Sequence, residues 1–513
     1  MSESVSTEPV RPDDPGPVPD SESLGRKAGR GLTWGLLGNG ITRIGSFATS
    51  LALARLLAPH DFGVYAVALA AMQFVIHIND IGLIPATIQW RGRLEDMAAT
   101  ASTLAASCSF LVYGVTWFLA PSFAHFSGVP EATWAIRLYT ANVLIDGITA
   151  VRSAYLLRTF QQRRYVLANA AGVVANGVVA IGLSFAGAGA MALVGGQLAS
   201  SATTSILVFA WARLPFRIGI DRAVARKLLA FGLPLTVSLA VQSILEQSDK
   251  VVVGRVLGAG VLGLYMLGVS ISGWTPGIIG GAVRFVSLPG FARLSERDED
   301  SLSKGVTRSL FLLFLAVIPI AVLIAVLADP LIMFLYGPKW LPAATPLRFL
   351  MILMVVRMVT GLCEDILNST GATRLTLAVN VGWLVVCAPA LWFATKGGGA
   401  EGAAFAQGAV GVLVAFPLMA YAVHRVGVPV SPLAGRLIRP LLAGTLTALV
   451  ALLLSHSVAG AGSFVQLAVG GSGGMLAYVF TAVPRSERRA WVDALRRARR
   501  PLKPASGPVA GTD

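Results

Sequence analysis

Residues 54–65 read ARLLAPHDFGVY, and residues 254–265 read GRVLGAGVLGLY. The two segments match at a constant offset of 200 positions. The positions that recur are Arg55 and Arg255, Leu57 and Leu257, Gly63 and Gly263, and Tyr65 and Tyr265. Each segment joins one long apolar run to the next, so the match falls at the ends of two pairs of predicted helices.

A second pair of segments repeats with a similar spacing. GAGAMALVGGQ (187–197) lines up with GGGAEGAAFAQ (397–407) at an offset of 210. Both matches lie at corresponding helix ends, which indicates that the first six helices are repeated by the next six. Two six-helix halves enter the membrane from the same side, so the repeats are parallel. Parallel halves are typical of transporters that bind substrate between them, near the middle of the membrane.

The composition places most of the chain in lipid. Hydrophobic residues make up 55% of the 513 residues and charged residues only 13%, with a mean hydropathy of +0.70. Soluble domains carry about 25% charged residues, so this chain lacks the polar sequence to cover an aqueous surface. Windows of about 20 apolar residues predict an all-α polytopic membrane protein with about fourteen transmembrane helices. Twelve of these form the two repeats around a central cavity, and two extra helices follow.

The predicted helices divide the chain into six parts. They lie at about 31–57, 60–83, 96–120, 131–157, 165–186, 189–212, 228–253, 260–285, 305–328, 343–370, 374–395, 400–424, 434–455 and 464–483. The parts are a disordered tail with a basic collar (1–30), an N-terminal six-helix bundle (31–212), a basic linker (213–227), a C-terminal six-helix bundle (228–425), helices 13 and 14 (426–483) and a basic tail (484–513).

Positive charge predicts the orientation. The net charge is +15, and most of the 41 Lys and Arg residues fall in the linker, the C-terminal tail and alternate loops. Because Lys and Arg collect in cytoplasmic loops, we expect both termini in the cytoplasm. Topology thus accounts for the charge, and we expect no nucleic-acid partner.

Several chemistries lack their motifs. The three cysteines, Cys108, Cys363 and Cys387, lie far apart in apolar runs, and the five histidines are scattered, so we expect no metal site. No GxxxxGK[ST] phosphate-binding loop is present in the sequence. The predicted external loops are too short for an active site of acidic or His residues. We therefore expect no catalytic residues and no enzyme activity.

Five segments carry a resemblance to a known family. They are ARLLAPHDFGVYAVALA (54–70), NDIGLIPATIQ (79–89), SDKVVVGRVLGAGVLGLYMLG (248–268), FLYGPKWLPAATPLRFL (334–350) and LNSTGATRL (367–375). With these the chain resembles the polysaccharide transporter (O-antigen flippase-like) family of the multidrug/oligosaccharidyl-lipid/polysaccharide flippase superfamily. The resemblance implies two helical bundles around a central cavity. It also implies export of a polyprenyl-pyrophosphate-linked oligosaccharide across a bacterial-type cytoplasmic membrane, for cell-surface polysaccharide biosynthesis.

A pyrophosphate-linked substrate needs cations inside the membrane. A charge within a span costs at least about 2.5–3.5 kcal/mol, so such residues usually face a watery cavity or a partner, and Arg binds phosphate oxygens with two N–H groups at once. We predict that four residues line a cationic cavity and bind substrate: Arg43, Arg152, Lys250 and Arg357.

Three acidic residues in the predicted spans have two open interpretations. Asp146, Glu246 and Asp249 either couple transport to H⁺ or Na⁺, or pair with nearby cations. Glu246 and Lys250 are four positions apart and share a helix face. We expect no bound cofactor.

The expected partners are the lipid-linked glycan, membrane lipids and polysaccharide-assembly proteins. Two alternatives remain in the same superfamily, a peptidoglycan lipid-precursor flippase and a drug/cation antiporter. A cationic cavity disfavours the antiporter, because like charges repel.

Overall fold

The computed structural model describes residues 21–80, 94–159, 161–212, 214, 219–276, 299–428 and 431–482. Within these ranges the regular secondary structure is entirely helical. The chain divides into two compact units. The first comprises Met1–Leu57, Ala71–Phe123 and Glu131–Ala240, and the second comprises Ala58–Ala70, Ala124–Pro130 and Val241–Asp513. The tips of two N-terminal helices therefore belong to the second unit.

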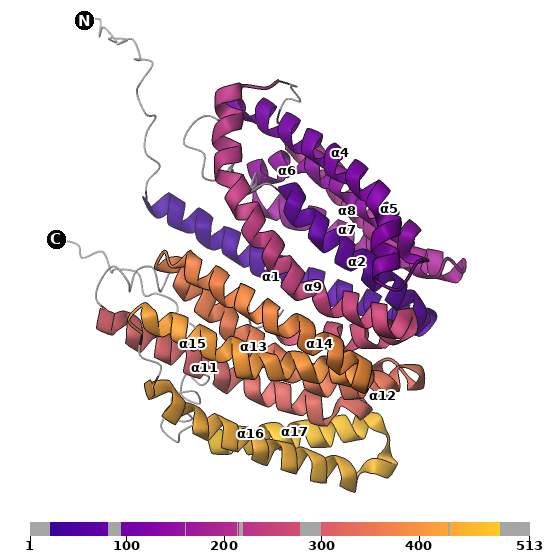
Figure 1. Cartoon of the computed structure of the whole chain (residues 1–513), viewed down its shortest axis with the longest axis vertical. Helices are drawn as coiled ribbons and strands as arrows, with labels where there is room; N and C mark the ends of the chain where they lie inside the picture. Colours follow the sequence, from indigo (N-terminus) through magenta and orange to yellow (C-terminus); the bar gives the residue numbers. More distant parts are fainter. Residues whose placement is uncertain are drawn as a thin grey trace, which may run out of the picture. The chain divides into compact units, whose positions relative to one another are not determined.

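The first unit is built from helices. They are α1 (Ser21–Leu56), α2 (Pro59–Asp80), α4 (Leu94–Phe126), α5 (Ala132–Thr140), α6 (Asn142–Arg158), α7 (Gln162–Phe185) and α8 (Ala190–Trp211). Figure 1 shows α7 beside α8, and α7 also packs against α1. Small residues permit these approaches, since Gly45 of α1 faces Val173 and Gly172 of α7 faces Thr204.

The second unit holds the remaining helices. They are α9 (Arg222–Ser272), which begins in the first unit, α11 (Glu299–Val326), α12 (Ala328–Leu335), α13 (Ala344–Ser369), α14 (Thr373–Val410), α15 (Phe416–Arg425), α16 (Ser431–Ser457) and α17 (Ser463–Ala482). A 3₁₀ turn (Pro338–Ala343) precedes α13. Helix α13 packs between α11 and α14, and α16 and α17 lie side by side and against α11 (Figure 1).

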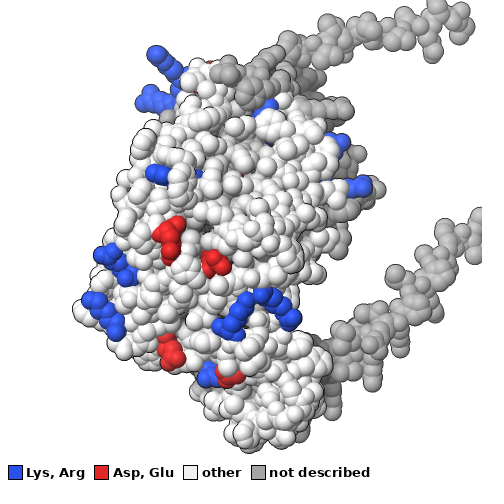
Figure 2. Space-filling model, turned by 90° about the vertical axis from the view of Figure 1, so that its right-hand side faces the viewer, with Lys and Arg blue, Asp and Glu red and all other residues white. Residues whose placement is uncertain are grey.

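Length and composition suit membrane crossing. Among the described residues, nine helical stretches are long and apolar enough to span a membrane. Of these stretches, Thr373–Arg425 covers two predicted spans, and Gln242–Ser272 overlaps parts of two others. On the face shown in Figure 2, charged side chains form isolated groups in an otherwise uncharged surface. The chain is thus an all-α protein that crosses the membrane several times, while the count of fourteen stays a prediction.

The residues Pro59, His60 and Asp61 begin α2, and two of them suit a helix start. Pro59 occupies the first position of α2, where a missing N–H costs nothing. The Asp61 carboxylate accepts a hydrogen bond from the Ala58 N–H at 3.0 Å, and it lies in the first helical turn, where the helix dipole favours negative charge. The predicted helix boundary near Pro59 is therefore confirmed.

Helix α9 reverses direction at Gly258. This residue has φ 77° and ψ 178°, values outside the helical region. The Tyr265 hydroxyl lies 3.2 Å from Asp249 Oδ2, although sixteen residues of straight helix would span about 24 Å. α9 is therefore two antiparallel helices joined at Gly258, which confirms the predicted split there.

The repeated segments share backbone features. Gly189 (φ 54°, ψ −132°) precedes α8, and Gly399 (φ 63°, ψ −147°) interrupts α14, at the predicted offset of 210. Gly63 closely contacts the backbone of Ala259, and Gly263 closely contacts that of Pro59. Adding 200 to Gly63 gives Gly263, and subtracting 200 from Ala259 gives Pro59. The two contacts therefore join equivalent positions of α2 and of the second arm of α9.

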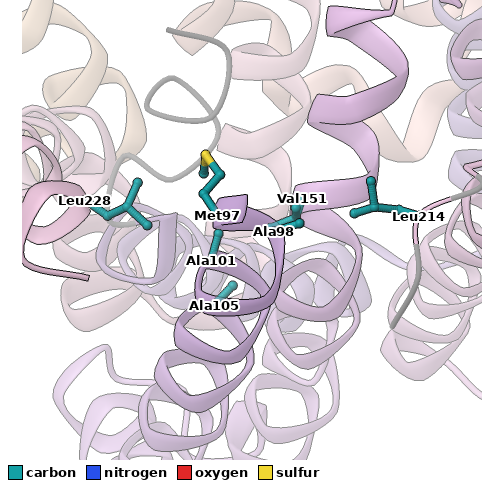
Figure 3. Packing of buried hydrophobic residues seen from close by; sticks show 7 residues of the cluster. All are labelled: Met97, Ala98, Ala101, Ala105, Val151, Leu214 and Leu228. Carbon is teal, nitrogen blue, oxygen red and sulfur yellow. The ribbon is translucent and has the colours of Figure 1, made fainter. Parts of the chain in front are cut away.

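The segment after α8 is anchored to the first unit by hydrogen bonds and apolar packing. The N–H groups of Gly219 and Asp221 donate to the hydroxyls of Thr103 and Thr100, at 3.2 and 3.0 Å. The Asp221 carboxylate in turn caps α9 by accepting from the N–H of Ala223 at 2.7 Å. Figure 3 shows the buried cluster beneath it, made of Met97, Ala98, Ala101, Ala105, Val151, Leu214 and Leu228.

Two predicted boundaries differ from the structure. α1 begins at Ser21, so the basic collar expected in a disordered tail (1–30) is helical from that residue. α9 begins at Arg222, so the end of the predicted linker (213–227) is also helical. In both places Lys, Arg and Ala, which favour helices, extend an apolar helix beyond its hydrophobic part. The basic tail (484–513) lies outside the described residues.

Helices 13 and 14 of the prediction are α16 and α17. Gly444 of α16 contacts Ile318 of α11, and Gly474 of α17 contacts Leu323 of the same helix. Large apolar side chains of α16 are exposed on its other side, namely Ile438, Leu441, Leu442, Leu449, Leu452 and Leu453. The pair therefore packs on α11 and presents a surface suited to lipid.

Candidate functional site: charged residues within the helices

A buried ion pair lies in the first arm of α9. Lys250 and Asp249 are 6% and 1% exposed, and Lys250 Nζ lies 3.4 Å from Asp249 Oδ1. Lys250 Nζ also donates to the backbone carbonyl of Glu246 at 3.2 Å. Tyr265, from the second arm, donates to the other carboxylate oxygen of Asp249. Lys250 and Asp249 thus compensate each other, and a carbonyl and a tyrosine hydroxyl of the same hairpin add one hydrogen bond to each.

This ion pair differs from the pairing of Glu246 with Lys250 that their sequence spacing suggests. Lys250 contacts the main chain of Glu246 rather than its carboxylate, and the Glu246 carboxylate accepts from the Gln242 amide at 3.2 Å. An ion pair between Glu246 and Lys250 is therefore absent from this structure. Adjacent Asp249 takes that place because its side chain is the more deeply buried and receives the Tyr265 hydroxyl as well.

Arg357 lies near the same hairpin. It is the midpoint residue of α13, with 13 residues before it and 12 after it in the helix. Both Arg357 and Asp249 are close enough to Tyr265 and to Cys387 of α14 to interact with them electrostatically. The second unit therefore gathers Asp249, Lys250 and Arg357 around one buried tyrosine.

Arg43 is exposed in the middle of a long helix. It lies thirteen positions before Leu56, the end of α1, which corresponds to about 20 Å of helix. The face of α1 that packs against α7 contains Gly38 and Gly45. Arg43 lies two residues before Gly45, about 160° away around the helix at 3.6 residues per turn. Its side chain thus points away from α7 and is exposed.

Arg152 is buried inside the first unit, at 3% exposure. Its guanidinium lies 4.0 Å from the centre of the Phe209 ring, and Nη2 donates to the carbonyl of Leu214 at 3.4 Å. Leu214 belongs to the segment between α8 and α9. Arg152 therefore holds that segment against α6 and α8.

Asp146 stands apart from the other acidic residues. It lies on α6, six positions before Arg152, and most of its surface is covered. Among the described residues its carboxylate forms neither a hydrogen bond nor an ion pair. Charge pairing, one of the two interpretations left open for Asp146, is thus not observed.

Sequence reasoning missed the aromatic partners of the charged residues. Tyr265 matches Tyr65 in the repeat, but only the reversal at Gly258 brings its hydroxyl to Asp249. Phe209 is one apolar residue among many in α8. The available clue for Tyr265 was the glycine turn at Gly258, which follows the charged Asp249 on the same segment. No sequence signal singles out Phe209.

Known proteins resemble this chain in sequence. It is 26% identical over 314 residues to the succinoglycan biosynthesis transport protein ExoT of Rhizobium meliloti (strain 1021), covering 61% of this chain and 63% of that relative. The match thus spans less than two thirds of the relative's length. The chain is 22% identical over 383 residues to the lipopolysaccharide biosynthesis protein WzxC of Escherichia coli (strain K12), covering 74% of this chain and 77% of that protein.

Solved structures share the fold and sequence comparison shows the family. The lipid II flippase MurJ in an inward closed conformation aligns with a TM-score of 0.71 at 12% identity, covering 91% of this chain and all of that one. An inward-facing multidrug resistance MATE family transporter of the MOP superfamily aligns with a TM-score of 0.59 at 15% identity, covering 76% of this chain and 94% of that one. At these identities the likeness shows the fold alone.

Residues 52–345 match the family described as polysaccharide biosynthesis protein, and the chain therefore belongs to that family.

Proposed function

We propose that this protein is a flippase that moves a polyprenyl-pyrophosphate-linked oligosaccharide across the bacterial cytoplasmic membrane for cell-surface polysaccharide biosynthesis. Family membership and the similarity to proteins named for succinoglycan transport and lipopolysaccharide biosynthesis support it. The substrate exposes a glycan on one side and then the other as the two six-helix halves rock. Both termini lie in the cytoplasm in this scheme.

The exposed cation in the middle of α1 carries the proposal. Arg43 lies about 20 Å from the end of its helix and on the side away from α7. A guanidinium within a span faces a watery cavity or a partner, and the proposal places the exposed Arg43 side chain at a watery cavity. Its planar fork suits a pyrophosphate, whose two phosphates offer several oxygens to adjacent N–H groups. Within the second unit, Arg357 at the middle of α13 is the other cation to which the proposal assigns phosphate binding.

The four predicted cations now have different roles in the proposal. Arg43 and Arg357 bind the pyrophosphate. Lys250 already pairs with Asp249, and Arg152 holds the Leu214 segment. These two therefore shape the site through the helices that they fix, and their loss affects folding before it affects substrate affinity.

Uptake into proteoliposomes tests the proposal. A fluorescent polyprenyl-pyrophosphate oligosaccharide is supplied on one side, and its transfer is followed for the native protein and for Arg43→Ala, Arg357→Ala and Arg348→Ala. Arg348 is the matched control, because it sits on α13 near Arg357 but pairs with exposed Asp329. We expect transfer by the native protein and the control, and loss of transfer by the other two. A native protein that leaves this lipid untouched contradicts the proposal.

A second candidate is a peptidoglycan lipid-precursor flippase. The structural match to lipid II flippase MurJ, at 12% identity, shows a shared fold and does not decide between the two substrates. Supplying lipid II in the same vesicles separates the two candidates. Faster transfer of lipid II than of the oligosaccharide lipid would favour the second.

Ion coupling completes the proposal, with Asp146 as the coupling group. Asp249 is neutralised by Lys250, and Glu246 accepts from Gln242, whereas Asp146 keeps a carboxylate without a bound partner in the described part of the chain. Such a carboxylate inside a span can take up H⁺ or Na⁺. We expect Asp146→Asn to transport without response to an imposed pH or Na⁺ gradient, and Glu246→Gln to keep the native response. An Asp146→Asn protein with the full gradient response would exclude this role.

A further inference from the structure

An arginine on α5 lies between two tryptophans. The Arg137 guanidinium carbon is 4.7 Å from the centre of the Trp117 ring and 5.1 Å from that of Trp134. The two rings are 6.0 Å apart and nearly perpendicular, at 84°. Tyr113, one turn before Trp117 on α4, packs edge-on against Trp117 at 5.9 Å and lies within electrostatic range of Arg137. We call Tyr113, Trp117, Trp134 and Arg137 the arginine box.

The box fixes the arginine but leaves most of its donors available. Arg137 Nε donates to the backbone carbonyl of Trp117 at 3.2 Å. The guanidinium has four further N–H groups, on Nη1 and Nη2, and none of them has an acceptor among the described residues. Glu131, at the start of α5, forms no ion pair with Arg137. The fork is therefore oriented by two rings and a carbonyl while its outer edge is open.

The position of the box near the start of α5 points to a ligand. Arg137 is five residues from Ala132, the first residue of α5, which amounts to about 7.5 Å of helix. The polar headgroup layer adds roughly 5–8 Å on each side of a hydrocarbon core of about 30 Å. The long side chain of an arginine near a helix end can reach the layer of lipid phosphates. Trp134 is 56% exposed, so the open side of the box faces outward from the helices.

We propose that the arginine box binds the phosphate of an anionic membrane phospholipid. A phosphate accepts two parallel hydrogen bonds from the Arg137 fork. The exposed face of Trp134 covers the glycerol and the first methylenes of the lipid, since a tryptophan ring combines apolar area with an N–H donor. The bound lipid is a resident of the bilayer and is distinct from the transported substrate. It fixes α5 against α4 at one membrane surface.

Another cation of the chain offers a matched comparison. Lys396 Nζ lies 4.7 Å above the Trp392 ring near the reversal in α14. It is exposed, has one ring rather than two, and forms no hydrogen bond among the described residues. It shares with Arg137 the charge and the tryptophan but lacks the fixed fork. Replacing Lys396 therefore measures the general contribution of an interfacial cation.

Native mass spectrometry of the purified full chain, with phosphatidylglycerol added to the micelles, tests the proposal. We expect Arg137→Gln to bind the first phosphatidylglycerol about tenfold more weakly than the native protein does, the change for one charge-assisted hydrogen bond. Lys396→Gln should change the affinity by less than about twofold, as for an exposed charge. Diacylglycerol has no phosphate, so it should bind the native protein and Arg137→Gln with the same affinity.

Each other outcome overturns the proposal. Equal affinity in Arg137→Gln and the native protein removes the box as a lipid site. If Lys396→Gln weakens phosphatidylglycerol binding as much as Arg137→Gln does, the effect is one of general charge. If diacylglycerol binds tightly, the box does not recognise the phosphate. If Arg137→Gln does not fold, Trp134→Leu keeps the arginine and opens one wall, and it must still weaken phosphatidylglycerol binding. Transport of the oligosaccharide lipid is a separate readout, so the proposed function stands or falls independently.

Discussion

Lys250 in the second unit and Arg152 in the first are both nearly fully buried, but the chain holds them in different ways. Lys250 has a carboxylate beside it, and that carboxylate has a tyrosine hydroxyl. The contacts described for Arg152 are an aromatic ring and a main-chain carbonyl of the segment between α8 and α9. The first arrangement cancels charge within one hairpin, whereas the second uses charge to fasten a connection. Burial of a cation therefore does not by itself mark a substrate site.

The largest expected effect comes from breaking the α9 ion pair. Asp249→Ala leaves the Lys250 ammonium buried without its carboxylate, and loss of one partner of a buried pair costs about 3–5 kcal/mol. We expect a strongly lowered thermal unfolding midpoint in detergent. The double change with Lys250→Met should recover most of the loss, because no uncompensated charge remains. A single variant that unfolds at the native temperature would contradict the role of the pair.

Removal of the Arg152 contacts should have a smaller effect. Arg152→Met keeps apolar volume on Phe209 but leaves the Leu214 carbonyl without a charged donor, which costs about 2–3 kcal/mol. Limited proteolysis should then cut the 212–221 segment faster than in the native protein. Arg152→Lys, which keeps the charge, should fall between the two. Unchanged cleavage in Arg152→Met would show that the segment is held by its other contacts alone.

The tyrosine across the hairpin sharpens the same comparison. Tyr265→Phe removes one donor from Asp249 while leaving Lys250 in place, so we expect a loss of about 1.5 kcal/mol in unfolding free energy. In an Asp249→Ala background the further change should cost almost nothing, since the acceptor is already gone. This double-mutant cycle fails if the two losses simply add.

The exposed ion pair between α12 and α13 should have the smallest effect. Arg348 and Asp329 form an ion pair with side chains 41% and 52% exposed. Exposed pairs contribute about 0–1 kcal/mol, so Arg348→Gln should shift the unfolding midpoint only slightly, and less at high salt. A shift as large as that of Asp249→Ala would remove the distinction between buried and exposed pairs.

Helix positions were largely predictable from the sequence because apolar length and turn residues determine them locally. The reversal at Gly258 and the start of α2 at Pro59 followed from glycine, proline and aspartate at the ends of apolar runs. Helix ends beyond the hydrophobic core were missed at Ser21 and Arg222, because basic residues extend helices as readily as they form polar segments.

The candidate site was predictable only as a set of charges. Sequence spacing within one helix suggested that Glu246 and Lys250 pair. The preference of Lys250 for Asp249 depends on Tyr265, which arrives through a reversal of the chain. The two rings around Arg137 come from separate helices. Contacts that require two elements to meet are set by tertiary packing, which no local pattern records.

The reversal at Gly258 has a consequence for membrane insertion. The first arm of α9 carries Asp249 and Lys250. Each charge at the centre of a lone helix costs about 2.5–3.5 kcal/mol to insert into the membrane. The second arm brings Tyr265 to that carboxylate and holds no Lys, Arg, Asp or Glu between Val256 and Ser272. We therefore expect the two arms to leave the translocation machinery as a single hairpin, with the apolar second arm drawing its charged neighbour into the bilayer.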